Sequence, residues 1–319
     1  MLRKAFIAGV ACAAVVAAGT GRATATDPAA LLAKYAPVLR LYAADRKPSA
    51  IEPFLAGADL ERLSGDAWHL VRSRPPAAAL ANGSKQLRLN TRGCSPATNL
   101  DACYGRRATP PTIYGRVWTA PTGSAGPATV LQYWLFYALD DWRNSPTKPT
   151  LWHMHEGDWE EVSVSLDAAG KPLEVAASQH DLGVRRVWAR TQLRDGTHPV
   201  VYVALGSHAN YLVPGFHGVA GIPHSIPPRF SGLPVAEPDF TSAQASVTGA
   251  KIVDLSGGTQ PWLSFAGAWG DGSFVLIRNP KTGKYLHLPV GDSPPGPAFH
   301  AIWRDPLRQF RTWPVDDGH

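Results

Sequence analysis

Hydrophobic and polar positions alternate most clearly in the segment GDWEEVSVSLD, residues 157–167. A period of two predicts a β-strand whose successive side chains point to opposite faces. One predicted face carries, in order, Asp158, Glu160, Val162, Val164 and Leu166, and the other carries Trp159, Glu161, Ser163, Ser165 and Asp167. We expect the first face to meet the core and the second to meet solvent. Two carboxylates on a buried face are unfavourable unless they are charge-paired or bind a metal ion.

Other segments have a similar β-forming character. Strands are predicted over residues 113–119, 129–139, 173–179, 198–205 and 251–255, with a hairpin over 274–288 and a helix followed by a strand over 29–41. The run 129–139 is apolar and rich in aromatic residues, which predicts a central strand covered on both faces. Thirty Gly and 29 Pro favour short strands and many turns. We therefore expect an all-β fold, an antiparallel β-sandwich with long loops and a few short helices.

The first 25 residues have the features of a signal peptide. A basic start and an apolar run precede the small residues Ala23-Thr24-Ala25, which is the pattern of a cleavable secretory signal. We expect cleavage near Ala25 and a secreted mature chain, with residues 26–319 as a single β-sandwich domain and the motif core at about 113–217. Lipid attachment through Cys12 is the alternative.

The net charge and the hydropathy exclude two classes of protein. The formal charge is +6, and three of the basic residues lie in the predicted signal peptide. The remainder has no concentrated basic stripe, which argues against a nucleic-acid-binding protein. Outside the predicted signal peptide, no apolar run reaches the roughly 18 residues that a transmembrane helix needs. We expect a monomer.

Two cysteines remain after signal cleavage. Cys94 and Cys103 bound the polar segment SPATNLDA. In an oxidising compartment such an isolated pair predicts a disulfide. Two unrelated thiols are the alternative.

Three predicted strands have histidines at or near one end, and these ends are predicted to meet. In an antiparallel hairpin the start of strand 158–166 lies beside the end of strand 173–179, which places Asp158 and Glu160 near His180. His208 joins them if strand 198–205 is a neighbour. An imidazole and inward carboxylates at one rim predict a metal or acid–base site.

The candidate cation ligands are His155, Asp158 and Glu160, with Asp140, Asp141 and His153 as further possibilities. Imidazole together with carboxylate oxygens suits Mg, Ca or Mn more than Zn. In the alternative interpretation, Arg185 or Arg186 pairs with the inward carboxylates and no metal binds. His153 is equally well explained as a solvated side chain, and Asp140 and Asp141 as loop residues.

Tryptophans near the predicted rim are candidate ligand contacts. Trp142, Trp152 and Trp159 could stack on sugars or lie at a membrane interface, and plain packing is the better explanation for Trp159. The string HEGDW lacks the second His of the zinc-protease motif H-E-x-x-H, and Ser207 in GSHA lacks the G-x-S-x-G elbow. These two hydrolase classes are therefore excluded.

Several segments, in this order, resemble the vacuolar protein sorting-associated protein 62 family. They are APVLRLYAADRKPSAIEPFL, LQYWLFYALDDW, HMHEGDWEEVSVSLD, SQHD, THPVVYVALGSHANYLVPG, FAGAWGDG and SPPGPAF. The resemblance covers most of the mature chain and implies no settled activity.

A more distant resemblance is to the necrosis- and ethylene-inducing-peptide-like (NPP1-like) cytolysins, secreted β-sandwiches with a G-H-R-H-D-W-E block. There the first His, the Asp and the Glu hold a divalent cation needed for membrane-sugar recognition. The resemblance implies the same role for His155, Asp158 and Glu160, with a further ligand at Asp140 or Asp141. Gly157 stands in place of the second His.

Two functions follow as expectations. The first is a divalent-cation-dependent module that recognises a glycan or a lipid head group. The second is a metal-dependent hydrolase in which His180 or His208 transfers protons. The sequence does not decide whether the protein is an enzyme.

Overall fold

The structure is a computed structural model that describes residues 27–95, 98–104, 110–180, 182–218 and 238–316. The predicted signal peptide lies outside these ranges. Within them the chain is mostly β, with few and short helices, as the sequence predicts. No helix in the described part of the chain is both long and apolar enough to cross a membrane.

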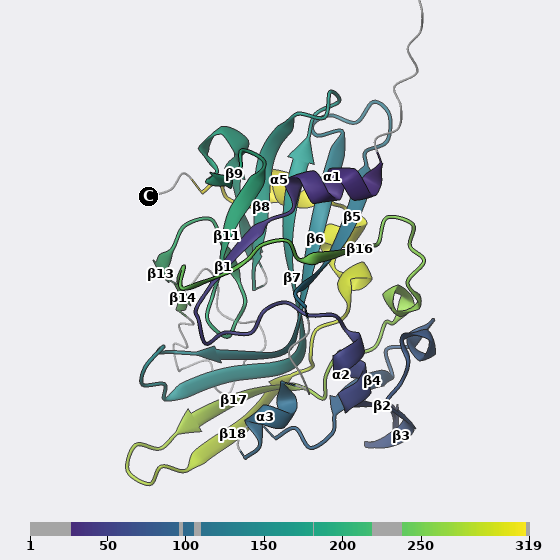
Figure 1. Ribbon diagram of the computed structural model, residues 1–319. Helices are drawn as coiled ribbons and strands as arrows, with labels where there is room; N and C mark the ends of the chain where they lie inside the picture. Colours follow the sequence, from purple (N-terminus) through teal and green to yellow (C-terminus); the bar gives the residue numbers. More distant parts are fainter. Residues whose placement is uncertain (1–26, 96–97, 105–109, 181, 219–237, 317–319) are drawn as a thin grey trace, which may run out of the picture.

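Within the described residues the strands form four sheets, whose strands are drawn as arrows in Figure 1. The largest contains β5 (Thr112–Thr119), β6 (Thr129–Arg143), β7 (Leu151–Leu166), β8 (Pro172–Gln179), β9 (Leu182–Val187), β16 (Lys251–Asp254), β17 (Ser273–Arg278) and β18 (Tyr285–Gly291). A second sheet contains β1 (Val38–Leu41), β10 (Leu193–Arg194), β11 (His198–Val203), β12 (Asn210–Tyr211) and β15 (Ala245–Val247). Pairing is antiparallel except for β1 with β11 and β16 with β5, which are parallel.

Two smaller sheets and several helical turns complete the described fold. The smaller sheets are β2 (Ala58–Ser64), β3 (Ala67–Ser73) and β4 (Leu87–Thr91), and β13 (Gly215–His217) with β14 (Asp239–Thr241). The helices are α1 (Pro28–Tyr35), α2 (Glu52–Gly57), α3 (Leu100–Cys103), α4 (Ala301–Arg304) and α5 (Arg308–Thr312), with 3₁₀ turns at Ala77–Leu80, Trp188–Arg190, Pro261–Ser264 and Pro297–Phe299. Helix α1 begins where the Asp27 side chain accepts from the Ala29 N–H and Pro28 fills the first turn.

The two main sheets pack face to face as a sandwich. Its core joins one face of β6, β7 and β8 to β1, β11 and β15, through residues such as Leu39, Tyr133, Val164 and Val201. The opposite face of the large sheet is also covered, by an aromatic cluster that includes Trp134, Trp159 and Trp262. Strand β6 is thus buried on both sides, which confirms the central strand predicted from its apolar sequence.

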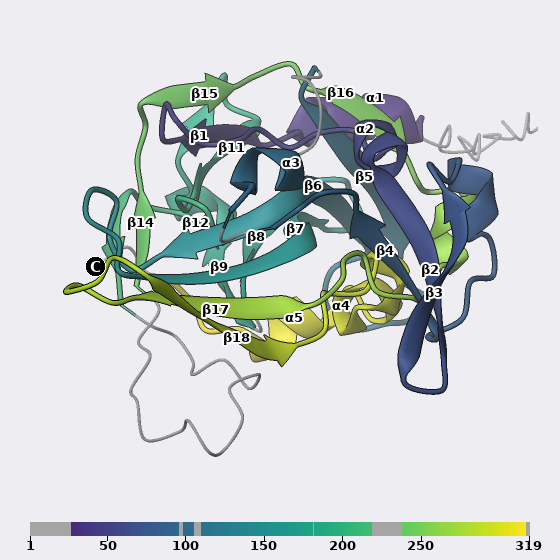
Figure 2. The same cartoon turned by 90° about the horizontal axis from the view of Figure 1, so that it is seen from below.

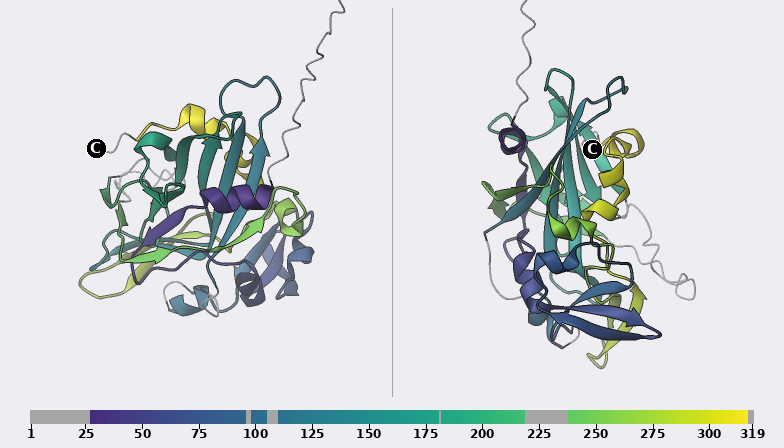
Figure 3. Two further views of the ribbon diagram at one scale, coloured as in Figure 1. Left: turned by 45° about the horizontal axis from the view of Figure 1, so that its top comes forward. Right: turned by 90° about the vertical axis from the view of Figure 1, so that its right-hand side faces the viewer.

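One sequence expectation about β7 is wrong. Glu161, Ser163 and Ser165 were expected on a solvated face, yet all three are buried, as is Trp159 on the same face. The C-terminal segment with α4 and α5 covers this face (Figures 1 and 3). In that layer the Gln309 side-chain amide donates to Ser163 Oγ at 2.6 Å. Polar side chains on a strand indicate solvent only when no distant segment brings partners to them.

Candidate cation site

Strands β6 and β7 pair along their whole length and bend together at Gly157. Tyr137 is opposite Asp158 and Asp140 is opposite His155, so the register is continuous through the bend. Gly157 has a φ of +64°, a left-handed conformation that residues with a Cβ rarely adopt. Beyond the bend β7 leaves β8 and pairs with β17, and Figure 1 shows both strands turning into the layer with β17 and β18.

The bend resets the alternation of side chains along β7. In a regular strand His155 and Asp158 would point to opposite faces. Here one ligand atom from each of Asp140, His155 and Asp158 lies within 4.8 Å of the other two. A Cβ at Gly157 would overlap the carbonyl oxygen of Trp269, so the bend requires glycine for space as well as for conformation.

These three residues form the candidate cation site. Asp140 and Asp158 are each only 5 % exposed, and His155 Nε2 lies 3.4 Å from Asp140 Oδ2. Two of the three ligands expected from the sequence, His155 and Asp158, are thus adjacent. The third residue of the cluster is Asp140, which was expected only as a further possible ligand.

Glu160 lies outside this group of three. It follows Asp158 on the same side of β7, but its carboxylate accepts a hydrogen bond from the Ser178 hydroxyl. The Asn210 side-chain amide lies 3.5 Å from the same oxygen. Burial, and then the nearby Asp158, raises the pKa of Glu160 well above its ordinary value. Glu160 therefore belongs to a neighbouring polar group with Ser178 and Asn210 rather than to the three-residue site.

The electrostatics of the three residues suit a bound cation. Burial and the charge of Asp158 raise the pKa of Asp140 well above its usual range, because two buried carboxylates repel one another. Burial lowers the pKa of His155 to about 4, although Asp158 opposes this, so the imidazole is neutral at physiological pH. Two carboxylates and a neutral imidazole are a donor set for Mg, Ca or Mn.

His208 forms a hydrogen bond with Asp158. Its ring is fully buried, stacks on Tyr137 at 3.7 Å between centroids, and places Nδ1 2.9 Å from Asp158 Oδ2. On the other side Nε2 lies 3.7 Å from Asp45 Oδ1. Burial disfavours the charged ring, but Asp158 and Asp45 together raise the pKa of His208 well above its usual value. A charged His208 therefore offsets one of the buried carboxylates.

Asp45 is a site residue that the sequence reasoning missed. It lies in the polar segment after β1, where neither a strand pattern nor a histidine marks it. Its carboxylate also accepts from the Gly206 N–H at 3.4 Å. Two parts of the chain far apart in sequence are thereby joined beneath the candidate site.

His180 belongs to a second polar network. Its Nε2 lies 2.9 Å from Asp239 Oδ2, and Asp239 also accepts from the Ser207 and Tyr211 hydroxyls at 2.6 and 2.7 Å. These three donors lower the pKa of Asp239 although burial opposes them. The strand ends lie close together as predicted, because Ser178, next to last in β8, contacts Glu160 of β7. His180, two residues after Ser178, is not one of the three clustered residues.

The remaining candidate residues have other surroundings. Asp141 is bound by the Tyr104 hydroxyl and by Arg143, and it is 2 % exposed. His153 Nε2 lies 2.7 Å from Ser273 Oγ, and its ring is 6.2 Å from that of His155. The arginines of the metal-free interpretation pair elsewhere, Arg185 with Glu174 and Arg186 with Asp316.

The two candidate tryptophans are placed differently from one another. Trp142 is 1 % exposed and its indole N–H donates to the Pro238 carbonyl at 3.1 Å. It packs inside the protein, where it is not available to a surface ligand. Trp152 is half-buried and lies edge-on to Tyr285 at 5.5 Å.

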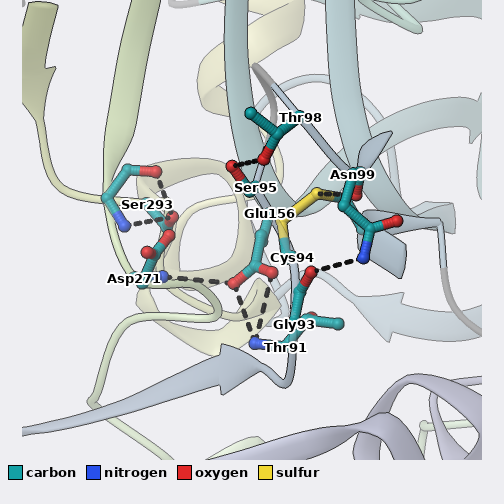
Figure 4. Close-up of a disulfide and its surroundings, with 11 residues drawn as sticks. Thr91, Gly93, Cys94, Ser95, Thr98, Asn99, Glu156, Asp271 and Ser293 are labelled. Atoms are coloured by element: carbon teal, nitrogen blue, oxygen red, sulfur yellow. Dashed lines mark hydrogen bonds between the residues drawn. A yellow bond between two sulfur atoms is a disulfide. The ribbon is translucent and has the colours of Figure 1, made fainter. Parts of the chain in front are cut away.

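The predicted disulfide is present and lies beside the bend (Figure 4). Cys94 and Cys103 close the loop between β4 and β5. Next to it, Glu156 accepts from the Thr91 N–H at 3.2 Å with both oxygens and from the Asp271 N–H at 3.3 Å. Burial and Asp271 raise the pKa of Glu156 to about 7. Glu156, which lies between His155 and Gly157, thus joins two other segments of the chain to β7 by hydrogen bonds.

Fold and site together define a mostly β protein with a candidate divalent-cation site at a bend of two paired strands. No protein-family model matches the chain. It is similar to vacuolar protein sorting-associated protein 62 of Saccharomyces cerevisiae, with 27% identity over 213 residues, which are 57% of this chain and 43% of the yeast protein. The chain therefore spans less than half of that relative. The resemblance to the vacuolar protein sorting-associated protein 62 family that the motifs indicated is confirmed as a similarity.

Among solved structures, similarity is found to the necrosis- and ethylene-inducing proteins, the second group that the sequence resembles. One, described as a toxin fold for microbial attack and plant defense, has a TM-score of 0.39 at 16% identity and covers 76% of this chain and 80% of its own. Another, NLPPya in complex with glucosamine, has a TM-score of 0.37 at 14% identity, covering 75% and 78%. Sequence identities of 16% and 14% and TM-scores below 0.5 imply nothing about the function of this chain.

Proposed function

We propose that this protein is a secreted binding module that holds one divalent cation with Asp140, His155 and Asp158. The observation that carries the proposal is the clustering of two buried carboxylates and a neutral imidazole within 4.8 Å. Buried acids at this separation repel one another, and a divalent cation removes that repulsion. Mg, Ca and Mn fit the oxygen-rich donor set better than Zn.

The cation would recognise an oxygen-rich ligand, either a glycan or a lipid head group. Three protein ligands leave places in a shell of six to eight oxygens, and hydroxyl or phosphate oxygens can fill them. The Cys94–Cys103 disulfide supports a secreted protein, because disulfides persist in oxidising compartments.

The burial of His208 argues against the alternative of a metal-dependent hydrolase in which His208 transfers protons. A histidine that transfers protons to a substrate must reach it. His208 is fully buried between Asp158, Asp45 and Tyr137, which gives it a role in holding Asp158.

The test is a calorimetric titration of the metal-free protein with Ca²⁺, Mg²⁺ and Mn²⁺. We expect one site, weakened at least tenfold by Asp140→Asn and by Asp158→Asn, since each change removes one of two anionic ligands. Glu161→Gln is the matched control, because it replaces a buried carboxyl group on the opposite face of β7. Equal affinity in all four proteins, or no binding to the wild type, would refute the cation site.

A further inference from the structure

The hairpin of β2 and β3 is an amphipathic arm on the outside of the molecule. It belongs to the sheet with order β3–β2–β4, in which β3 is the edge strand. Figures 2 and 3 show the turn of this hairpin extending beyond the neighbouring elements. In Ala67–Ser73 every residue except the half-buried Trp68 is exposed, although the strand contains several large apolar side chains.

The register places the apolar side chains of the hairpin together on one face. Leu63 is opposite Trp68, and Glu61 is opposite Leu70, so these four side chains share a face. Leu63 is 39% exposed, Leu70 61% and the adjacent Val71 49%. Clustered exposed apolar side chains on a soluble protein mark an interaction surface.

The other face of the hairpin is cationic. Arg62 is opposite His69 and Arg72 is opposite Leu60, and both arginines are exposed. The acids of β2 are already bound by basic residues of β4 and its following turn. Glu61 pairs with Arg88 at 2.8 Å and Asp59 with Arg92 at 3.7 Å. The exposed charged side chains of the arm are then Arg62, Arg72 and, in the turn, Asp66, so the net exposed charge is positive.

The edge of β3 is poorly suited to pair with another strand. The register shifts by one residue between Leu60 and Glu61, leaving Val71 as an extra residue in β3. A bulge and a nearby charged residue are two features by which edge strands resist added strands. A partner therefore meets the side-chain face of the arm rather than its backbone edge.

We propose that this hairpin docks the protein onto an anionic lipid bilayer. Leu63 and Leu70 enter the boundary between head groups and acyl chains, and Arg62 and Arg72 extend along the apolar surface to the lipid phosphates. A charged face beside an apolar face is the arrangement that lies in a membrane interface. This surface goes beyond the proposed cation site and does not need a bound cation.

The experiment is vesicle sedimentation in excess EDTA, so that failure of the cation site does not affect the result. Vesicles contain either phosphatidylcholine alone or phosphatidylcholine with 30 mol% phosphatidylglycerol, about the range in which anionic lipid binds basic segments. We expect the wild type to bind the anionic vesicles at least about tenfold more strongly than the neutral ones.

The variants separate the two faces of the hairpin. Leu63→Ser with Leu70→Ser should weaken binding to both kinds of vesicle by about tenfold or more, because two apolar side chains no longer leave water. Arg62→Gln with Arg72→Gln should reduce the preference for anionic vesicles. Leu286→Ser, at a 55% exposed leucine of β18, is the matched control and should bind as the wild type does.

Three results would overturn the proposal. They are wild-type protein that binds neither vesicle, Leu63→Ser/Leu70→Ser protein that binds like the wild type, and a dimer in solution that these two substitutions convert to monomer. In the third case a second copy of the chain covers the apolar face. Circular dichroism of each variant shows that the fold is retained, as is expected for substitutions at exposed positions.

Discussion

Different substitutions of His208 can separate its hydrogen bond to Asp158 from its packing against Tyr137. The ring donates through Nδ1 to Asp158 at 2.9 Å, while Nε2 faces Asp45 at 3.7 Å. Asparagine can place its amide nitrogen near the position of Nδ1, and glutamine near that of Nε2. We therefore expect His208→Asn to keep the hydrogen bond that orients Asp158, and His208→Gln to lose it.

The expected magnitude follows from the contact that is lost. A hydrogen bond to a charged group contributes about 1.5–3 kcal/mol, and loss of a residue that orients a metal ligand weakens metal binding about 10- to 100-fold. His208→Gln and His208→Ala should therefore lower cation affinity by about that factor, and His208→Asn by less than about threefold. Both amide variants lose the stacking on Tyr137, so both should melt below the wild type, and His208→Gln should lose more stability because it also loses the hydrogen bond to Asp158.

The assay is calorimetric titration with Ca²⁺ or Mn²⁺, with the melting temperature of each metal-free variant measured in parallel. If the asparagine and glutamine variants bind the cation equally, His208 does not orient Asp158. If all three variants bind the cation as tightly as the wild type, His208 has no part in the cation site.

Two further predictions concern β7. Gly157→Ala should cost about 3 kcal/mol or more of unfolding free energy, because it adds an overlap with a backbone carbonyl to a left-handed φ; Gly170→Ala, with a φ of +76° in open space, should cost only about 1–2 kcal/mol. Equal losses in urea unfolding would contradict the close approach at the bend. Burial raises the pKa of Glu161 to about 8 from an ordinary 4.5, so the folded state holds this proton more tightly and stability should fall as pH rises from about 4.5 to 8. Glu161→Gln should therefore be roughly 2–4 kcal/mol more stable than the wild type at pH 9 but not at pH 4. A difference in unfolding free energy that is the same at both pH values would disprove this.

Local patterns were sufficient to predict much of the sandwich. An Asp-Pro pair begins α1, an apolar aromatic run forms β6, and clean alternation forms β7 and its hairpin partner β8. In each case the signal lies within about 15 residues of chain. The sheet of β2, β3 and β4 was missed because several of its apolar residues stay exposed and so do not mark one buried face.

The site was predicted only in part, because its geometry depends on a change of backbone conformation. Strict alternation places Glu160 beside Asp158 and puts His155 on the opposite face. Gly157 reverses this relation by its left-handed φ, which brings His155 and Asp140 to Asp158. A glycine inside a strand pattern is a sequence signal for such an irregularity, but it does not show which side chains will meet.

The burial of charged groups follows from contacts that no local pattern contains. Asp45 reaches His208 from the segment after β1, and Gln309 reaches Ser163 from the C-terminal helix. Both contacts join residues more than 140 positions apart. Periodicity predicts which side chains share a face, whereas only the tertiary fold decides whether that face is covered.

The arrangement around Asp158 explains how so many acids coexist inside the sandwich. Asp45 and Asp158 flank His208, whose raised pKa keeps the ring charged and offsets one carboxylate. Asp140 remains, and burial and Asp158 raise its pKa well above the ordinary value, so without a cation it holds its proton more tightly than an ordinary aspartate does. A divalent cation competes with that proton at the same oxygen atoms. Cation binding and folding are therefore coupled through Asp140, because any ion that binds only the folded chain stabilises it.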